Sequence, residues 1–458
     1  MNNPNAPMDA YVPDCRTAIA DGMKLVVSRF EKHAGYPFVD TKLSTMDGTD
    51  FAPTAAPETD FRGPSAVFGW IQGRGLEAIA GHASYLTDTP DLAARCDRML
   101  AVVADRIASF GRANQGRFVF LMTPDGRPFR CGPDGKRAYF DARDIPPGFA
   151  DFFTGKGLAA AGVRLGRADL RDQGVATFRA AMAAVRDGTF ASDQISFDPK
   201  NRAEAVPGRH AQGPWMIALG GYALLCELCP RAGAWVDEGC LALGRMLDRH
   251  VVKTAGGGLR PYDFVEYTDD AGRPWRDQGR VLQDPGHAIE FTGLAARFLL
   301  HARACAPLSP AFRELYATCQ TALPEILLSA FANGFQRPAG GICKAYDLVG
   351  RVAINDDMPW WSLPESMRAA ALLLCLAPDH PRRAEVAAAA AACAQALFGR
   401  FRSPVPGLFV QTRNIHGDPV PVVPATPDAD PGYHTGLCLI DFVNACETLK
   451  RTHPGVLK

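Results

Sequence analysis

The chain has 458 residues, of which 47% are hydrophobic and 9% aromatic, enough for a large buried core. Lys and Arg together number 49, as do Asp and Glu, so the net charge is zero. Nucleic-acid and anionic-membrane partners normally go with a basic surplus, and this balance argues against both.

The N-terminal segment Met1–Pro13 carries Asn, Pro and Asp where a signal peptide would have a basic region and an apolar core. We therefore predict a flexible tail over residues 1–14, followed by a single domain over 15–458. No apolar run approaches the roughly 20 residues needed to cross a bilayer. The expected location is cytoplasmic.

Apolar residues then recur mostly at helical spacing, separated by Gly/Pro clusters, which predicts a large, mostly helical domain. The Ala-rich run Ala384–Ala396 is a strong signal, since alanine has the highest helix propensity. The predicted helices lie near residues 15–33, 65–85, 90–112, 166–187, 213–229, 233–251, 286–305, 309–333, 361–376, 381–400 and 433–449.

Signals for β-strands are few. Arg117–Met122 and Arg137–Phe140, joined through turns at Pro124–Gly126 and Pro133–Gly135, predict a small hairpin. Leu259–Tyr267 predicts another.

The thirteen cysteines are scattered and odd in number, which favours reduced, mostly buried thiols over a disulfide framework. Cys226 and Cys229 form a CxxC inside an apolar helical stretch. With no second CxxC or paired histidine, they are interpreted as core residues and not as a zinc or redox site.

Residues 284–290 read Asp-Pro-Gly-His-Ala-Ile-Glu and open an apolar helix. The Pro-Gly turn can hold His287 at the helix mouth, with Glu290 one turn later on nearly the same face. An imidazole beside a carboxylate at the start of a helix suits proton transfer. The motif alone also fits a histidine that only caps or packs.

Two further motifs follow. Adjacent Trp360 and Trp361, with Glu365 behind them, open another apolar helix. One of the rings can pack inward while the other offers a flat face to a sugar. Near the C-terminus, Tyr433-His434 again places a histidine where a helix begins.

Together these motifs resemble the N-acylglucosamine 2-epimerase family of sugar epimerases and aldose–ketose isomerases. Pro-Gly-His-x-x-Glu, Trp-Trp with a following Glu, and Tyr-His appear in the family's order. The earlier segment Trp70–Arg74 is similar to the family's Gln-x-Arg signature. The resemblance covers roughly residues 60–450 and implies an all-α fold. The implied architecture is an (α/α)6 barrel (toroid) with small β-hairpin insertions in the loops.

The resemblance also implies a sugar 2-epimerase or aldose–ketose isomerase that moves a proton at C2 of a free reducing sugar through an enediolate. In this hypothesis His287 and His434 are the acid/base pair, and Arg74 binds sugar oxygens and steadies the enediolate. Glu290 is expected to orient His287. The remaining candidate substrate-binding residues are Trp360, Trp361, Glu365 and His210.

The chain departs from the family pattern at two positions. Ile217 stands where family members carry a central active-site histidine, and His210, a few residues upstream, is a possible substitute. Leu437 stands where many members place an arginine, three residues after the last histidine. Both differences bear on the substrate and the reaction.

Other functions remain open. A glycoside hydrolase of the same fold would use paired carboxylates, drawn from Asp356, Asp357, Glu365, Asp263 or Glu266. A non-catalytic sugar-binding protein would keep the sugar pocket and lack the catalytic activity. Arg74 can also serve as an ion-pair partner of Glu77 on its own helix. We expect a carbohydrate substrate, no cofactor, no metal, no nucleic acid or membrane partner, and a monomer or homodimer.

Overall fold

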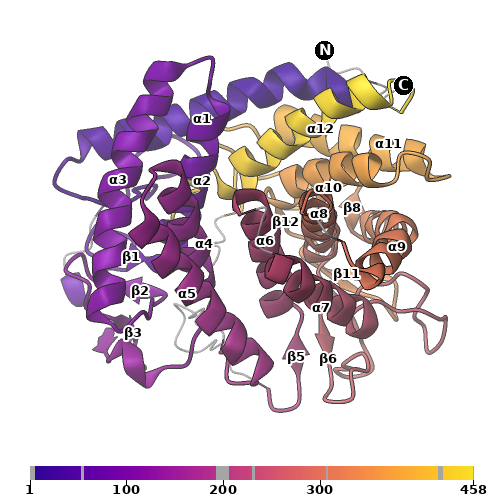
Figure 1. Cartoon of the computed structure of the whole chain (residues 1–458), viewed down its shortest axis with the longest axis horizontal. Helices are drawn as coiled ribbons and strands as arrows, with labels where there is room; N and C mark the ends of the chain where they lie inside the picture. The colour runs from indigo at the N-terminus through magenta and orange to yellow at the C-terminus, as the bar shows by residue number, and fades with distance from the viewer. Residues whose placement is uncertain are drawn as a thin grey trace.

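The computed structural model describes residues 6–52, 56–191, 206–229, 233–305, 308–420 and 427–456. Most of these residues are helical, and the helices follow one another around the molecule as hairpins (Figure 1). The α-helices within these ranges are α1 (Val12–Lys32), α2 (Gly69–Tyr85), α3 (Pro90–Ala113), α4 (Phe149–Arg164), α5 (Ala168–Arg186), α6 (Gly213–Leu228), α7 (Gly233–Arg249), α8 (Pro285–Ala302), α9 (Pro310–Gly334), α10 (Ser362–Leu376), α11 (Arg383–Ala396) and α12 (Cys438–Thr452).

These helices form an inner and an outer layer. Inner helices are buried nearly all round, as in α10, where fourteen of the fifteen residues are buried. Outer helices such as α3 and α7 bury one face only. Each even-numbered helix packs on the next, and the ring closes through the π-helical turn η5 (Tyr433–Leu437), which precedes α12 and contacts α2. The predicted (α/α)6 barrel is confirmed.

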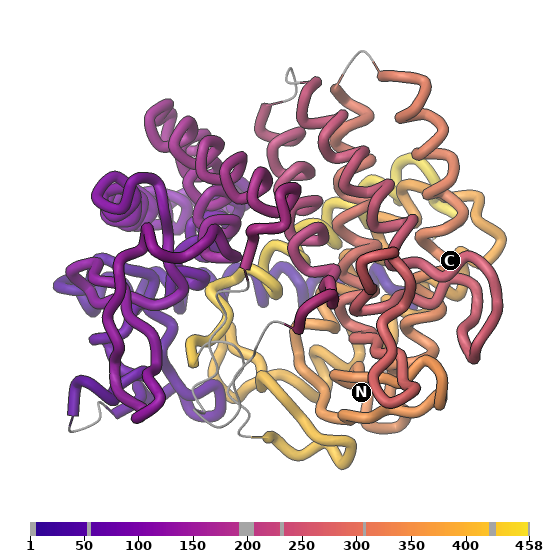
Figure 2. Tube along the Cα trace, turned by 90° about the horizontal axis from the view of Figure 1, so that it is seen from below, coloured from indigo at the N-terminus to yellow at the C-terminus, as the bar shows by residue number. Residues whose placement is uncertain are grey.

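The connections are long at one end of the barrel and short at the other. Residues 114–148 lead into α4 and residues 250–284 into α8, whereas residues 86–89 and 165–167 join inner helices to outer ones. Figure 2 shows the long loops gathered below the helices. The N-termini of the inner helices therefore all lie at the loop end. His287, Trp361 and His434 belong to this end.

Helix α4 is the one α-helix of the described ranges that the sequence analysis missed. It contains three glycines, which lower helix propensity, and it is buried all round, so it has no amphipathic pattern. The glycines serve packing. A Cβ at Gly157 would lie 2.3 Å from the carbonyl oxygen of Gly73, so α2 and α4 approach backbone to backbone. The glycines, which are unfavourable in a helix by propensity, are therefore explained by the contact between α2 and α4.

The strands are short antiparallel pairs in the long loops, as predicted in kind, but their pairing differs. The segment ending in β2 (Leu121–Met122) pairs with β1 (Val67–Phe68), and β4 (Arg137–Tyr139) pairs with β3 (Phe129–Cys131), so the predicted single hairpin is two successive turns. The predicted strand at Leu259–Tyr267 is mostly irregular, and only its last residue enters β6 (Tyr267–Thr268). The expected turn after it is present, because the chain reverses over residues 269–273 and Thr268 pairs with Pro274. On its other side β6 pairs with β5 (His210–Ala211). The remaining strands are β7 (Leu282–Gln283), β8 (Phe335–Gln336), β9 (Gly341–Ile342), β10 (Ala345–Asp347), β11 (Val352–Asn355), β12 (Met358–Pro359) and β13 (Thr412–Arg413).

The N-terminal helical segment begins earlier than expected. A 3₁₀ turn over Met8–Tyr11 leads directly into α1, and Met8 is fully buried, so the residues after position 7 are part of the folded domain. Residues 1–5 of the predicted tail lie outside the described residues.

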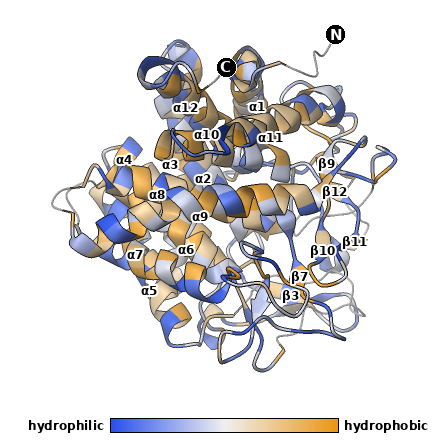
Figure 3. Ribbon diagram, turned by 90° about the vertical axis from the view of Figure 1, so that its right-hand side faces the viewer, coloured by the Kyte–Doolittle hydropathy of each residue, from blue (hydrophilic) through white to orange (hydrophobic). Residues whose placement is uncertain are grey.

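Figure 3 shows apolar residues concentrated along the helices and hydrophilic ones in the loops. Among the described helices, none combines the length and apolarity that a bilayer crossing requires.

Candidate active site

The first turn of α8 holds His287. Asp284 is the N-cap, and its Oδ1 accepts the backbone N–H of His287 at 3.2 Å, while Pro285 occupies the first helical position. The imidazole Nδ1 lies 3.1 Å from Glu266 Oε1 and 3.4 Å from Asp284 Oδ2. The ring is thus held by two carboxylates, one from its own cap and one from the loop before α8.

These carboxylates set the protonation of His287. Burial alone would lower the pKa of this imidazole, but the charges of Asp284 and Glu266 outweigh it and raise the pKa to about 9. Lys344 limits the rise, because its Nζ lies 2.5 Å from Asp284 Oδ2. At neutral pH His287 is therefore an imidazolium, able to donate a proton.

His434 is presented by η5. Asp430 accepts three successive backbone N–H groups through its two carboxylate oxygens, from Tyr433 at 2.9 Å, His434 at 3.2 Å and Thr435 at 2.8 Å. These bonds fix the first turn of the helix. π-Helical turns of this kind recur at functional sites because they displace a side chain from the regular helical position.

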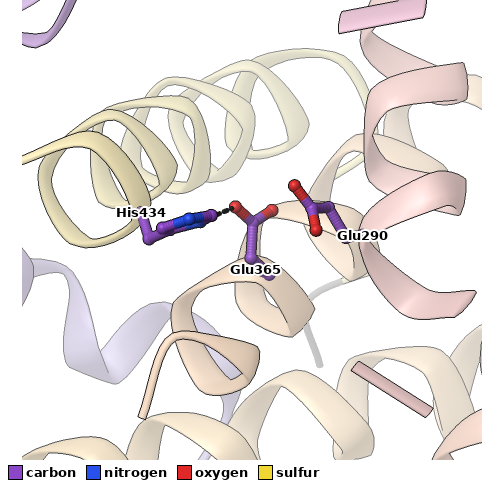
Figure 4. A group of neighbouring side chains, drawn as sticks. All are labelled: Glu290, Glu365 and His434. Carbon is purple, nitrogen blue, oxygen red and sulfur yellow. Dashed lines mark hydrogen bonds and ion pairs between the residues drawn. The ribbon is translucent and has the colours of Figure 1, made fainter. Parts of the chain in front are cut away.

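The His434 ring rests on Glu365 of α10. Its Nδ1 lies 2.9 Å from Glu365 Oε1 (Figure 4). The second oxygen of Glu365 is paired with Arg368, one turn further along α10. With the Nδ1 proton directed at the carboxylate, Nε2 is the basic nitrogen. Burial and the charge of Arg74 lower the pKa of His434 to about 4. This imidazole is neutral at neutral pH.

Trp361 packs near both histidines. Its ring centre is 5.5 Å from that of His287 and 5.6 Å from that of His434. A Cβ at Gly286 would lie 2.8 Å from the tryptophan ring, so the glycine of the Pro-Gly-His motif admits this contact. Trp360 turns inward, where it is buried and donates from Nε1 to Thr435 Oγ1 at 3.1 Å.

Both imidazoles reach solvent from this shared position. The side chain of His287 is 29% exposed and that of His434 is 13% exposed. Neither Nε2 has a hydrogen-bond partner in the part of the chain that the structure describes. Two imidazoles of opposite protonation thus lie beside one tryptophan ring, each with a nitrogen available to a ligand.

Arg74 extends from α2 into the same region. Its guanidinium carbon lies 4.2 Å from the ring centre of Phe153 and 5.3 Å from that of Tyr433. Its buried Nε has no hydrogen-bond partner among the residues that the structure describes. The alternative pairing of Arg74 with Glu77 does not occur, since the ion pair of Glu77 is with Lys156 at 3.0 Å. A fixed cation with donors to spare suits a developing oxyanion.

Glu290 lies apart from the ion pairs of His287 and beside Glu365 (Figure 4). The orienting carboxylates of His287 are therefore Glu266 and Asp284, where the sequence analysis expected Glu290. Glu290 is only 4% exposed, and burial together with the charge of Glu365 raises its pKa. The raised pKa favours the neutral carboxyl form, which can donate a hydrogen bond to a sugar oxygen.

The ligand atoms of Glu290, Glu365 and His434 lie within 4.8 Å of one another, a spacing that could hold a divalent cation. Two features oppose this. Arg368 occupies one oxygen of Glu365, and the positive charge of Arg74 acts on His434. The donor set is better matched to acid/base work than to a metal centre.

The other predicted residues lie elsewhere. His210 stands on β5, where its Nε2 pairs with Asp270 Oδ1 at 2.7 Å and its side chain is 54% exposed. Ile217 is buried in α6, and Leu437 lies against Gly81 of α2. Among the carboxylates considered for hydrolysis, Asp263 is buried and paired with Arg351.

Sequence reasoning missed several residues that organise the site. An Asp directly before Pro-Gly is a typical N-cap, and this signal could have indicated Asp284, although not its contact with the imidazole. Arg368 follows Glu365 by three residues, a spacing that places both on one helical face. Glu266 and Lys344 come from loops and carry no local signal.

The comparisons with known proteins bear on the fold. No family model and no curated protein matches the chain. Among solved structures, a sugar epimerase from a ruminal bacterium has a TM-score of 0.64 at 11% identity, covering 94% of this chain and 98% of its own. A D-mannose isomerase has a TM-score of 0.62 at 13% identity, covering 91% and 97%. The fold is that of these sugar epimerases and isomerases.

A family 76 glycoside hydrolase from a bovine Bacteroides thetaiotaomicron strain is less similar, with a TM-score of 0.51 at 10% identity, covering 97% of this chain and 78% of its own. The resemblance drawn from the motifs is thus confirmed for the fold. At such identities a shared fold does not carry the activity with it, so the function has to be argued from the site.

Proposed function

We propose that the protein is a sugar 2-epimerase or aldose–ketose isomerase, acting on the open-chain form of a reducing sugar. The observation that carries the proposal is the pair of imidazoles on Trp361. One is neutral and one protonated at neutral pH, and both keep Nε2 available. Proton transfer at C2 needs a base, an acid and a stabiliser of the enediolate.

In the proposed reaction, His434 Nε2 removes the C2 proton of the aldehyde sugar, and the electrons move to O1 to give the enediolate. Glu365 stabilises the imidazolium formed on His434, and Arg74 stabilises the oxyanion. Return of a proton from His287 to the opposite face of C2 gives the epimer. Delivery of a proton to C1, with transfer of the O2 proton to O1, gives the ketose.

The indole ring of Trp361 supplies the apolar surface on which the sugar is proposed to stack. Glu290, whose carboxylate lies within 4.8 Å of the ligand atom of His434, is the group expected to contact a sugar hydroxyl. The proposed substrate is accordingly a polyol with an apolar ring or chain face, as carbohydrates are.

The direct test is proton NMR of unprotected aldoses in heavy water with the wild-type protein. We expect loss of the C2 proton signal and the appearance of the C2 epimer or the ketose. A hydrolase would release reducing ends from oligosaccharides and leave the C2 proton of free aldoses in place. A binding protein would give thermal shifts with sugars and no exchange. Either result would overturn the proposal.

The hydrolase alternative has one observation in its favour, the close approach of the buried carboxyl groups of Glu290 and Glu365. Both oxygens of Glu365 are engaged, however, one by His434 and one by Arg368. A nucleophilic or general-base carboxylate needs a free oxygen. We therefore favour the isomerase.

The pKa values predict a bell-shaped pH dependence of kcat/KM. Below about pH 4 His434 becomes protonated and can no longer accept the C2 proton, and above about pH 9 His287 loses the proton that it donates. Glu266→Gln removes one charge that raises the pKa of His287, so the alkaline limb should move to lower pH by about one pH unit. Asp270→Asn, which removes the carboxylate at His210, is the matched control and should leave both limbs in place. An unmoved alkaline limb in Glu266→Gln would exclude His287 as the acid.

A further inference from the structure

A buried ion pair lies next to Arg74, between helices α2 and α4. Lys156 Nζ lies 3.0 Å from Glu77 Oε2 and donates to the phenolic oxygen of Tyr433 at 2.7 Å. The side chains of Lys156 and Glu77 are almost fully buried. Burial lowers the pKa of Lys156, but the charge of Glu77 outweighs this effect and raises it, so the side chain is an ammonium at neutral pH. The reaction proposed above uses neither charge.

The close crossing of α2 and α4 places this pair beside Arg74. Gly73 directly precedes Arg74, Gly157 directly follows Lys156, and a Cβ at either glycine would overlap backbone atoms of the other helix. The guanidinium carbon of Arg74 lies 5.3 Å from the ring centre of Tyr433, and the ammonium of Lys156 lies 5.0 Å from it. The two cations therefore contact one aromatic ring.

The spacing along α2 would allow Arg74 to pair with Glu77. The two residues are three positions apart, and oppositely charged side chains at this spacing on a helix pair readily. No carboxylate lies within ion-pair distance of Arg74 among the described residues, however. The carboxylate that could neutralise Arg74 is held by Lys156 of the neighbouring helix.

Arg297 of α8 is a further buried cation on which Glu77 acts. Burial lowers the pKa of Arg297, but the charges of Asp441, of Glu227 and, after these, of Glu77 raise it. Arg297 already lies 2.6 Å from Glu227 and 3.5 Å from Asp441. Arg74 has no such pair, so it is the cation that gains more from Glu77 when Lys156 is removed.

We propose that Lys156 is a positioning residue of the site, which keeps Glu77 away from Arg74 so that the guanidinium stays free for the enediolate oxygen. The inference rests on the role of Arg74 in the proposed reaction. An arginine that is paired with a carboxylate has less net charge and fewer donors for a developing oxyanion. The hydrogen bond to Tyr433 helps to hold the ammonium of Lys156 at the carboxylate.

Two single variants separate this role from that of a purely structural ion pair. Lys156→Met leaves Glu77 free to pair with Arg74, and we expect kcat for C2-proton exchange to fall about 10²-fold, with KM little changed. Glu77→Gln removes the competing carboxylate and should keep kcat within about threefold of wild type. A pair that served only to hold the helices together would suffer from the loss of either partner. Equal losses of kcat in the two folded variants would therefore overturn the inference.

The double variant Glu77→Gln/Lys156→Met carries neither charge, so it leaves no uncompensated ion in the interior. We expect its kcat to recover to within about tenfold of wild type, because no carboxylate is left to pair with Arg74. A folded but inactive double variant would overturn the inference, whether or not Lys156→Met itself folds. Denaturant unfolding shows that each variant is folded at the temperature of the assay.

The matched control is Arg186→Met, which removes a cation with the same two kinds of partner. Arg186 Nη2 lies 2.6 Å from Glu238 Oε2 and 3.2 Å from the phenolic oxygen of Tyr222. None of these residues contacts Arg74 in the described part of the chain, so kcat should equal that of wild type. A fall in kcat as large as that of Lys156→Met would show that the loss is not specific to the α2–α4 pair, and would overturn the inference.

Crystal structures of the wild type and of Lys156→Met test the inference without turnover. We expect the Arg74 guanidinium to lie within about 4 Å of the Glu77 carboxylate in the variant only. An unmoved Arg74, or a Glu77 that turns to Arg297, would overturn the inference. If Arg74 pairs with Glu77 as expected but the wild type exchanges no C2 proton, the role of Lys156 stands and the proposed reaction falls.

Discussion

Replacing His434 with glutamine is expected to lower the rate of C2-proton exchange by about 10³-fold, because it removes the only base proposed for that step. Glutamine retains a hydrogen-bonding side chain of similar reach toward Glu365 but cannot accept a proton at neutral pH. The loss should be in kcat, with KM little changed, since the imidazole acts on the transition state. Deuterium incorporation at C2 in heavy water is the measurement.

His287→Gln distinguishes the acid from the base. With His434 intact, the C2 proton should still wash out into heavy water, while formation of the epimer or ketose falls. In His434→Gln both processes should fall together. His416→Gln, which alters an exposed loop histidine, is the control and should match wild type. Undiminished C2 exchange in a folded His434→Gln protein would remove this residue from the mechanism.

Gly157→Ala is expected to destabilise the protein by about 3 kcal/mol, through the contact between α2 and α4. The added Cβ would lie 2.3 Å from the carbonyl oxygen of Gly73 and 2.9 Å from Leu76 Cβ, so the two inner helices have to separate. Alanine's better helix propensity, worth about 1 kcal/mol, opposes the loss only in part. Denaturant unfolding followed by circular dichroism measures the change in free energy of unfolding.

Gly244→Ala is the matched control, since it makes the same substitution inside helix α7. No atom lies within 4 Å of the Cβ that it would add. Here the propensity term acts alone, and the protein should gain up to about 1 kcal/mol of stability. Two identical substitutions in helices should thus change stability in opposite directions. A stabilised Gly157→Ala protein would contradict the close packing of α2 on α4.

The sequence predicted which residues form the candidate site better than it predicted the contacts that orient them. His287, Trp361, Glu365 and His434 each open an inner helix with a recognisable motif, and the structure brings them together. The role expected of Glu290 falls instead to Glu266 and Asp284, which contact His287 directly. Glu266 lies 21 residues upstream on an irregular loop, so no helical spacing relates the two.

The fold likewise was predicted where the signal is local and missed where it depends on contacts between distant segments. Outer helices such as α3, α5 and α7 bury one face and have a clear period, and α11 was predicted from its alanines. Helix α4 was missed, because it combines burial on every side with three glycines, which read as breaks when the helices that they contact are unseen. The strand pairings failed for a related reason: β1 and β2 are separated by more than fifty residues, and a two-residue strand carries almost no pattern.

What the sequence by itself determined about this protein is local: where most helices begin and end, and which helix starts carry histidine, tryptophan and glutamate. Capping, propensity and periodicity act over a few neighbouring residues, so they can be seen in the chain. The tertiary structure alone decided that His287 and His434 share one tryptophan, and that one is charged and the other neutral. Those properties depend on burial and on charges brought together from distant loops and helices, and such contacts leave no mark in the order of the residues.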